Sequence, residues 1–204
     1  MAIIAGKIGA VYMKTTDAST SFTTEATTAN LAKTRFTITD FSKSYWDTAT
    51  IPTVLKDGNP ITTGFSIEYV GGTIAMDVAL TTEVITVSGK HFTVSQVLGF
   101  SEWSLSLSMD IADVTKFEDV GWKTNFPTLK DYSVTAKKFW LTEEIFERLG
   151  EDVIISLYTD ATSSKRRYEG YARIDKDDVE VKVDAVITES ISFKGNGAVY
   201  YRQS

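Results

Sequence analysis

The chain has 204 residues, 43% of them hydrophobic and 12% aromatic, so it is long enough to bury one substantial core. It has no cysteine, which excludes disulfides, thiolate metal sites and cysteine nucleophiles. Its formal net charge of −6 disfavours a protein that grips duplex DNA, because such proteins cluster Lys and Arg against the phosphates. No stretch resembles a signal peptide or a membrane span, so we expect one domain over residues 1–204, made in the cytoplasm, without membrane insertion.

The first sixty residues alternate between short β-branched runs and polar segments. Residues 7–13 predict a first strand, and residues 34–39 and 53–56 predict two more. Between them, residues 15–34 are mostly Thr, Ser and Ala with few large apolar side chains, which predicts a loop or extended arm. A turn is expected at residues 56–60, where Gly, Asn and Pro occur together.

Hairpin signals dominate the middle of the chain. Residues 65–70 and 73–76 flank Gly71-Gly72, a pair suited to the positive φ angles of a tight turn. Residues 102–109 alternate large apolar side chains with serines, as expected of a strand with one face on a core. Residues 110–129 show no sustained period and predict a long loop or arm that contacts another surface.

The last third predicts one helix among strands. Residues 142–150 carry a capping Thr142, a stripe of Ile145, Phe146 and Leu149, and a terminating Gly150. Further strands are predicted at residues 132–140, 152–159, 166–175, 179–183, 185–194 and 198–201. The expected fold is therefore mainly β, an antiparallel sandwich or barrel-like arrangement with one flanking helix and long loops.

Residues able to perform catalysis or hold a metal are sparse. His91 is the only imidazole and lies in a predicted strand, where a structural role is the better interpretation. The acidic run at 175–180 lacks the central Gly and late Glu of a calcium loop and indicates a solvated hairpin end. The basic run at 165–167 is too short for a nucleic-acid surface. We predict no catalytic residue, metal site or cofactor, and hence no enzyme.

Two passages resemble the tail tube proteins of long-tailed bacteriophages, the major tail proteins. Residues 64–94, GFSIEYVGGTIAMDVALTTEVITVSGKHFTV, are similar to a hairpin module of that family, and residues 168–201, YEGYARIDKDDVEVKVDAVITESISFKGNGAVY, are similar to its C-terminal ending. The resemblance implies a structural subunit that assembles into hexameric rings, which stack into a tube for DNA ejection. It implies a tail location in the virion, with assembly in the host cytoplasm.

The resemblance also implies partners and surfaces. Partners are other copies of the chain and further tail proteins, namely the tape measure, terminator and baseplate or tip, with DNA only passing through an acidic lumen. Candidate lumen-facing carboxylates are Glu169, Asp175 and Glu180. Candidates for contacts between rings or subunits are the aromatic side chains of the long segment and the basic hairpin tip: Phe117, Trp122, Phe126, Arg166 and Arg167.

Two alternatives stay open. Another ring-forming component of a tail or of a contractile injection machine would share the fold and differ only in its loops. A carbohydrate-binding β-sandwich could instead present Trp46, Trp103, Trp122 and Trp140 to a sugar. Of these, Trp103 and Trp140 are expected in the core, whereas Trp46 and Trp122 lie in irregular segments, where they could be exposed.

Overall fold

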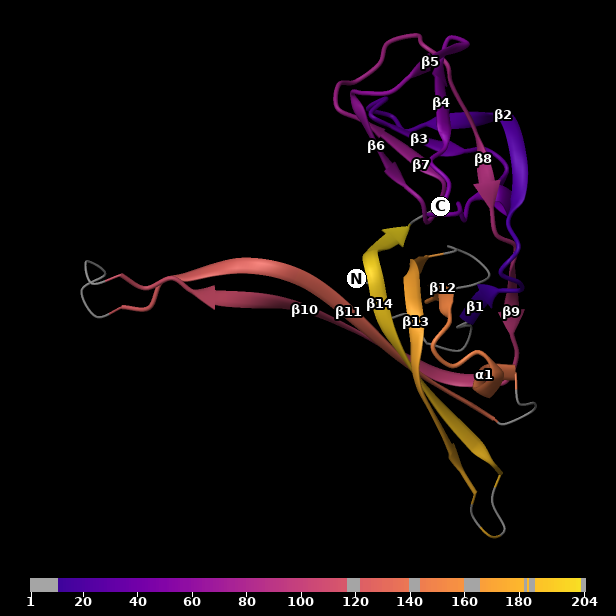
Figure 1. Cartoon of the computed structure of the whole chain (residues 1–204), viewed down its shortest axis with the longest axis vertical. Coiled ribbons are helices and arrows are strands. Elements are labelled where there is room, and N and C mark those ends of the chain that lie inside the picture. The colour runs from indigo at the N-terminus through magenta and orange to yellow at the C-terminus, as the bar shows by residue number, and fades with distance from the viewer. Residues whose placement is uncertain are drawn as a thin grey trace. The chain divides into compact units, whose positions relative to one another are not determined.

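The computed structural model describes residues 11–116, 122–139, 144–159, 166–181, 183 and 186–202, and most of them lie in antiparallel strands (Figure 1). The predicted mainly β, antiparallel fold is confirmed. Contacts divide the chain into two compact units. Unit 1 holds the described residues within 98–153 and from 157 onward, and unit 2 holds residues 11–97 and 154–156. The prediction of a single domain over residues 1–204 stays a prediction.

Unit 2 is built of short strands and one 3-10 turn. These are β1 (Val11–Lys14), β2 (Thr20–Ala29), β3 (Arg35–Ile38), η1 (Phe41–Lys43), β4 (Thr53–Lys56), β5 (Asn59–Ile61), β6 (Phe65–Glu68), β7 (Thr73–Met76), β8 (Ile85–His91) and β9 (Val94–Val97). Seven of them form a sheet in the order β5-β4-β8-β2-β3-β7-β6, and β1 pairs with β9. Their alternating apolar side chains build a core around Trp46, Ile74 and Val87.

The predicted hairpin at Gly71-Gly72 is confirmed. Strands β6 and β7 pair antiparallel, with Ile67 opposite Ile74. Both glycines have positive φ, and a Cβ on Gly72 would lie 2.8 Å from Cγ2 of Ile38, so conformation and space both favour glycine there.

The prediction of a loop or arm over residues 15–34 is wrong for its central part. Strand β2 occupies ten of these residues and pairs with both β8 and β3. Phe22 points into the core, while most of the Thr and Ser side chains are exposed. Threonine is β-branched and suits a strand that needs only one large apolar anchor, so its abundance did not mark a loop.

Unit 1 consists of longer strands and one turn of helix. These are β10 (Phe100–Asp113), β11 (Asn125–Phe139), α1 (Glu144–Glu147), β12 (Asp152–Tyr158), β13 (Arg167–Glu180) and β14 (Thr188–Arg202), with the middle of β12 assigned to unit 2. The strand order is β10-β11-β14-β13-β12. This sheet curls, because the ring of Trp103 on β10 reaches that of Tyr168 on β13, with 6.4 Å between centroids. Its inner face carries Val134, Ala136, Ile191 and Phe193, all buried.

The predicted helix over residues 142–150 is shorter in the structure. Of its apolar stripe, Ile145 is buried, but Phe146 and Leu149 are largely exposed, because a single turn presents only one side chain to the sheet. Gly150 ends the segment with a φ of +85°, as predicted. Thr142 lies outside the described residues. No helix in the described part of the chain is long and apolar enough to cross a membrane.

Candidate assembly surface

The outer half of strands β10 and β11 forms a two-stranded ribbon. The two strands pair from Phe100 opposite Lys138 to Asp113 opposite Asn125. In the described part of the chain, β11 pairs with β14 only over Ser133–Phe139, so residues 125–132 have β10 as their one neighbouring strand. We call residues 107–113 together with 125–132 the ribbon; Figure 1 shows it running on beyond the other strands of unit 1.

The ribbon corrects the prediction of a loop over residues 110–129. Strand β10 continues to Asp113 and β11 begins at Asn125, so strand structure covers both ends of the predicted loop. A shift of register between Met109 and Ile111 interrupts the alternation of side chains. Pro127 lies just past this bulge on a strand without a second neighbour, a position that tolerates the missing N–H. The broken period and the proline concealed the strands in the sequence.

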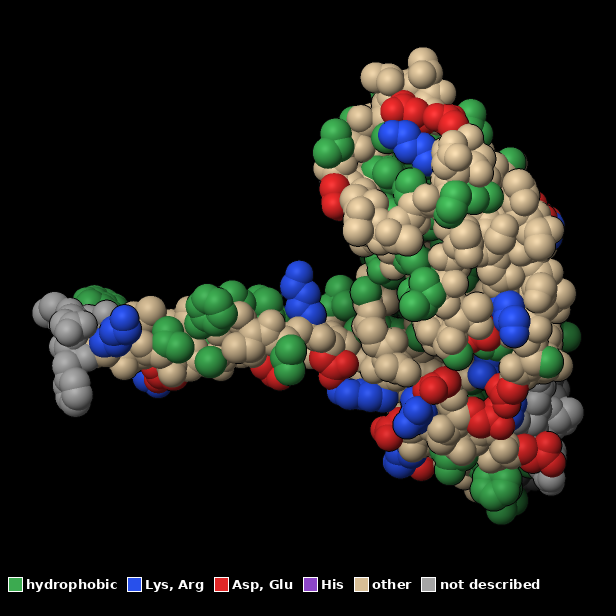
Figure 2. All heavy atoms as spheres, turned by 45° about the horizontal axis from the view of Figure 1, so that its top comes forward, with side chains coloured by type: hydrophobic (Ala, Val, Ile, Leu, Met, Phe, Trp, Pro, Cys, Tyr) green, Lys and Arg blue, Asp and Glu red, His purple; other side chains and the backbone are tan. Residues whose placement is uncertain are grey.

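Large apolar side chains on the ribbon are exposed. Before the bulge, Leu107 and Met109 continue the apolar face of β10 into solvent. Past it, Ile111 is 64% exposed and lies opposite Pro127, while Phe126 is 61% exposed and lies on the other face. Figure 2 shows such hydrophobic side chains along the ribbon. A two-stranded hairpin is at best marginally stable in water, so a ribbon with apolar groups on both faces has the properties of a docking element.

A groove of about 930 Å³ lies where the ribbon leaves β14. The pairing of β11 with β14 ends at Ser133 opposite Lys194, and beyond this point the two strands diverge. The lining residues come from both ribbon strands and from the small-residue segment of β14: Leu107, Ser108, Met109, Asp110, Leu129, Lys130, Asp131, Tyr132, Gly195, Gly197, Ala198 and Val199. The groove is therefore bordered by two strand edges that no strand in the described part of the chain pairs with at this point.

Tyr132 lies at the point where β11 and β14 diverge. Its hydroxyl donates a hydrogen bond to the carbonyl oxygen of Tyr171, and burial raises the pKa of its phenol well above the ordinary value. The ring lies over Gly195, where an added Cβ would be 2.8 Å from Cγ of Tyr132 and closer still to Cδ1. Only glycine leaves room for this ring.

Replacing Gly195 by alanine is expected to lower the free energy of unfolding by about 1–3 kcal/mol, because the methyl group overpacks the Tyr132 ring. Denaturant unfolding of Gly195→Ala, Tyr132→Ala and the double variant measures this. In the Tyr132→Ala background the Gly195→Ala substitution should cost little. An equal cost in both backgrounds would show that the ring is not the reason for the glycine.

Of the predicted lumen carboxylates, Glu169 does not fit. It is 1% exposed and accepts hydrogen bonds from Nε of Arg167 at 2.8 Å and from Nε of Arg202 at 2.9 Å. A carboxylate held between two guanidinium groups inside the protein offers no free charge to a lumen. The same pairing buries Arg167, so it does not fit its predicted role in a contact between subunits.

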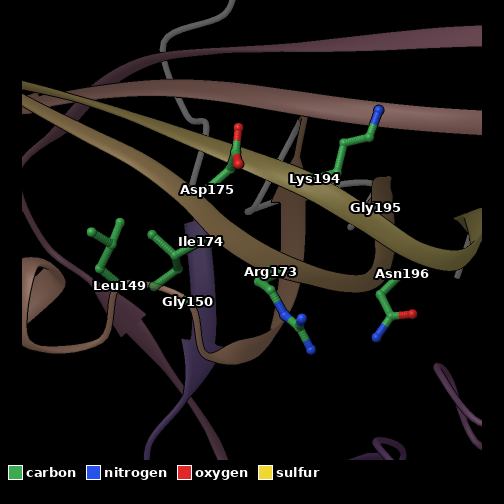
Figure 3. A pocket seen from close by; sticks show the side chains of 8 residues that line it. All are labelled: Leu149, Gly150, Arg173, Ile174, Asp175, Lys194, Gly195 and Asn196. Atoms are coloured by element: carbon green, nitrogen blue, oxygen red, sulfur yellow. The ribbon is translucent and has the colours of Figure 1, made fainter.

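Asp175 and Glu180 are exposed, and their place in a lumen wall stays a prediction. Asp175 borders an open hollow of about 600 Å³ in unit 1. Figure 3 shows the residues that line this hollow: Leu149, Gly150, Arg173, Ile174, Asp175, Lys194, Gly195 and Asn196. Its two cations are neutralised, since Arg173 binds both carboxylate oxygens of Asp152, at 3.0 and 3.1 Å, and Lys194 pairs with Asp131. The hollow has no evident acid–base pair.

The other predicted contact residues divide into two groups. Trp122 and Phe126 are strongly exposed, Phe126 on the ribbon and Trp122 just beyond its end. Arg166 is half-buried next to β13, and its contact role stays a prediction. Phe117 lies outside the described residues.

The residues considered for catalysis or sugar binding are mostly packed against other side chains. His91 is buried at the end of β8, with its ring 6.0 Å from that of Phe22. Trp46, considered as an exposed candidate, is fully buried in the core of unit 2, and Trp103 is half-buried; Trp140 lies outside the described residues. Among the described residues, no group of three or more His, Asp or Glu side chains could hold a metal ion. Trp46 is therefore not available to stack against a sugar in the carbohydrate-binding alternative.

No protein-family model matches the chain, and no curated protein matches it. Two solved structures are similar to part of the chain. One is from the tail of an empty gene transfer agent particle, with 15% identity and a TM-score of 0.45 over 54% of this chain and 87% of that one. The other is from the virion of a native gene transfer agent particle, with 12% identity and a TM-score of 0.42 over 53% of this chain and 88% of that one. At these TM-scores the likenesses carry no argument about function.

Proposed function

We propose that this chain is a structural subunit of a phage-type tail tube, and that it assembles by packing the ribbon of one copy against another copy. The observation that carries this proposal is the ribbon itself, a two-stranded element with exposed Ile111 and Phe126 on opposite faces. Such an element exposes apolar surface to water, which is unfavourable unless a neighbour covers it. The sequence resemblance of residues 64–94 and 168–201 to tail tube proteins supports the identity of the assembly.

A contact between the ribbon of one copy and a different surface of the next would lead to rings and tubes and not to a closed dimer. A ribbon that packs on a different patch of the next copy makes a heterologous contact, and repeated heterologous contacts close into a ring or continue as a filament. The free strand edges at the groove would then be paired, which removes an aggregation hazard of the single chain. In this proposal the rings are hexameric and stacked, the lumen conducts DNA, and the protein is located in the virion tail, performs no catalysis and needs no cofactor.

Sedimentation of the purified full chain over a concentration series tests the proposal. The expected result is a concentration-dependent shift from monomer to large species, which weakens when the apolar surface of the ribbon is made polar. A chain that stays monomeric at every concentration, and also when mixed with preformed tail assemblies, would contradict the proposed function. Glycan titration with tryptophan fluorescence separates the carbohydrate-binding alternative, which requires quenching of exposed Trp122.

A further inference from the structure

A buried lysine on the inner face of unit 1 pairs with a carboxyl group that interacts with a second carboxyl group. Lys138 on β11 lies directly opposite Glu189 on β14, and both side chains are 2% exposed. The distance from Nζ of Lys138 to Oε2 of Glu189 is 3.1 Å. On β13, Asp177 lies opposite Ile191, which is two residues from Glu189 and on the same face of β14. The three polar side chains therefore come from three adjacent strands, and Glu189 interacts with both Lys138 and Asp177.

The surroundings of this cluster disfavour separated charges. The next pair along the inner face is Ala136 with Ile191, and both residues are fully buried. Burial raises the pKa of the Glu189 carboxyl, Lys138 opposes this increase, and Asp177 adds to it. Glu189 thus lies between one ammonium group and a second carboxyl group, and its surroundings favour the protonated form of its carboxyl.

The contact between Lys138 and Glu189 is close without being a well-directed hydrogen bond. Oε2 of Glu189 is buried and, among the described residues, accepts no hydrogen bond of good geometry, although Nζ of Lys138 is at ion-pair distance. Oδ1 of Asp177 is likewise buried without a hydrogen-bond partner among the described residues. A nucleophilic nitrogen, a carboxyl carbon and a spare proton acceptor thus lie together in a place from which water is largely excluded.

We propose that Lys138 and Glu189 condense to form an amide cross-link between β11 and β14, with Asp177 carrying the proton. The ammonium group of Lys138 gives one proton to the Glu189 carboxylate. The neutral amine then attacks Cδ of Glu189 and forms the C–N bond, and Asp177 accepts the second proton from the attacking nitrogen before the C–OH bond breaks. Asp177 returns its proton to the departing hydroxyl, which leaves as water. One ammonium and one carboxylate become one amide and one water, and no oxidant or cofactor is required.

In water this condensation is slow, and the fold favours it in two ways. Adjacent strands hold the reacting groups in contact, which replaces a bimolecular encounter by an intramolecular one. Burial raises the pKa of the Glu189 carboxyl and so favours the neutral acid, which is the form that the amine attacks. The product would covalently join the strand that carries the ribbon to its neighbour in the sheet, so a force on the ribbon could peel β11 from β14 only as far as Lys138. This inference concerns the single folded chain and does not depend on the proposed function.

Intact-mass spectrometry of the folded full chain tests the cross-link. The expected mass is lower than that of the sequence by one water, and fragmentation of a protease digest should find the peptides of Lys138 and Glu189 joined. Lys138→Arg keeps the positive charge but should show its full calculated mass. The Asp177→Asn variant should still fold, and its amide cross-link should form about 100-fold more slowly than that of the wild type.

The wild-type measurement alone decides the inference, even if a variant fails to fold. A full sequence mass in freshly purified protein and again after prolonged incubation in the folded state would overturn it. Loss of water with the joined peptides elsewhere in the chain would overturn it equally. An unchanged rate for Asp177→Asn would overturn the assignment of Asp177 as the proton carrier.

Discussion

A chain with both Ile111→Asp and Phe126→Asp is expected to remain monomeric at concentrations where the wild type assembles. The two side chains lie on opposite faces of the ribbon and are mostly exposed in the single chain, so any partner that covers the ribbon must desolvate the new carboxylates. Loss of an interface hot spot costs about 2 kcal/mol or more. Two such losses should raise the concentration needed for assembly by at least about 100-fold, measured by sedimentation velocity.

The matched control is Leu31→Asp in unit 2. Leu31 is as exposed as a side chain can be and lies outside the ribbon, so the same change in chemistry should leave assembly unchanged. Thermal unfolding of the dilute monomer should differ little among the wild type, the control and the ribbon variant, because exposed substitutions change stability by about 0.5 kcal/mol or less. Equal loss of assembly in the control and the ribbon variant would show that added charge, and not the ribbon, is responsible.

Glu169→Ala is expected to be strongly destabilising. It removes the carboxylate that accepts hydrogen bonds from both Arg167 and Arg202 and leaves a buried guanidinium group without this anion. Breaking a buried ion pair by removing one partner costs about 3–5 kcal/mol. For a chain of this length the melting temperature should fall by about 10 °C, measured by scanning calorimetry.

The control for Glu169 is Glu102→Ala. Glu102 pairs with Lys137 at 2.5 Å, but both side chains are more than half exposed. Such a surface pair contributes about 0–1 kcal/mol, so its loss should hardly change the melting temperature. If both variants melt alike, the Arg167–Glu169–Arg202 cluster does not have the stabilising role that its burial indicates.

The sequence predicted the class of fold and the tight hairpin well, because both depend on local signals. Alternation over residues 102–109 and the Gly71-Gly72 pair act within a few residues, and the structure has a strand and a turn at these places. The helix was predicted too long because three apolar residues at helical spacing say nothing about how much of the helix reaches a core. Strand β2 was missed because its threonines suit a strand and a loop alike.

The candidate surface was harder to predict because it depends on pairing between distant residues. Whether Glu169 points into the protein or out of it is decided by the register of β13 against β14, where Arg167 lies opposite Arg202. The Lys138–Glu189 contact likewise arises from the register of β11 with β14, and neither residue stands out in the sequence. A bulge after Met109 hid the ribbon by shifting the alternation. The exposed aromatic residues Trp122 and Phe126 were nevertheless the correct signal that this segment presents apolar surface.

The proposed assembly and the proposed cross-link would act on the same strand in different ways. Residues 125–132 of β11 belong to the exposed ribbon. After Ser133 the strand pairs with β14 and carries Lys138 on the inner face of the sheet. A load on the ribbon would therefore reach the pair Lys138–Glu189 after the strand pairs from Ser133 to Lys137. The two proposals stand on separate observations, and a mass measurement on the monomer decides the second without reference to the first.

Negative-stain electron microscopy of the purified chain across a concentration series, with the Ile111→Asp/Phe126→Asp variant alongside, tests the central claim most directly. We expect rings or tubes with a central bore for the wild type and for Leu31→Asp, and only single particles for the ribbon variant at the same concentrations. Rings or tubes formed equally well by the ribbon variant would contradict assembly through the ribbon. A wild-type chain that shows only single particles at every concentration, and does not add to preformed tail assemblies, would contradict the tube subunit itself.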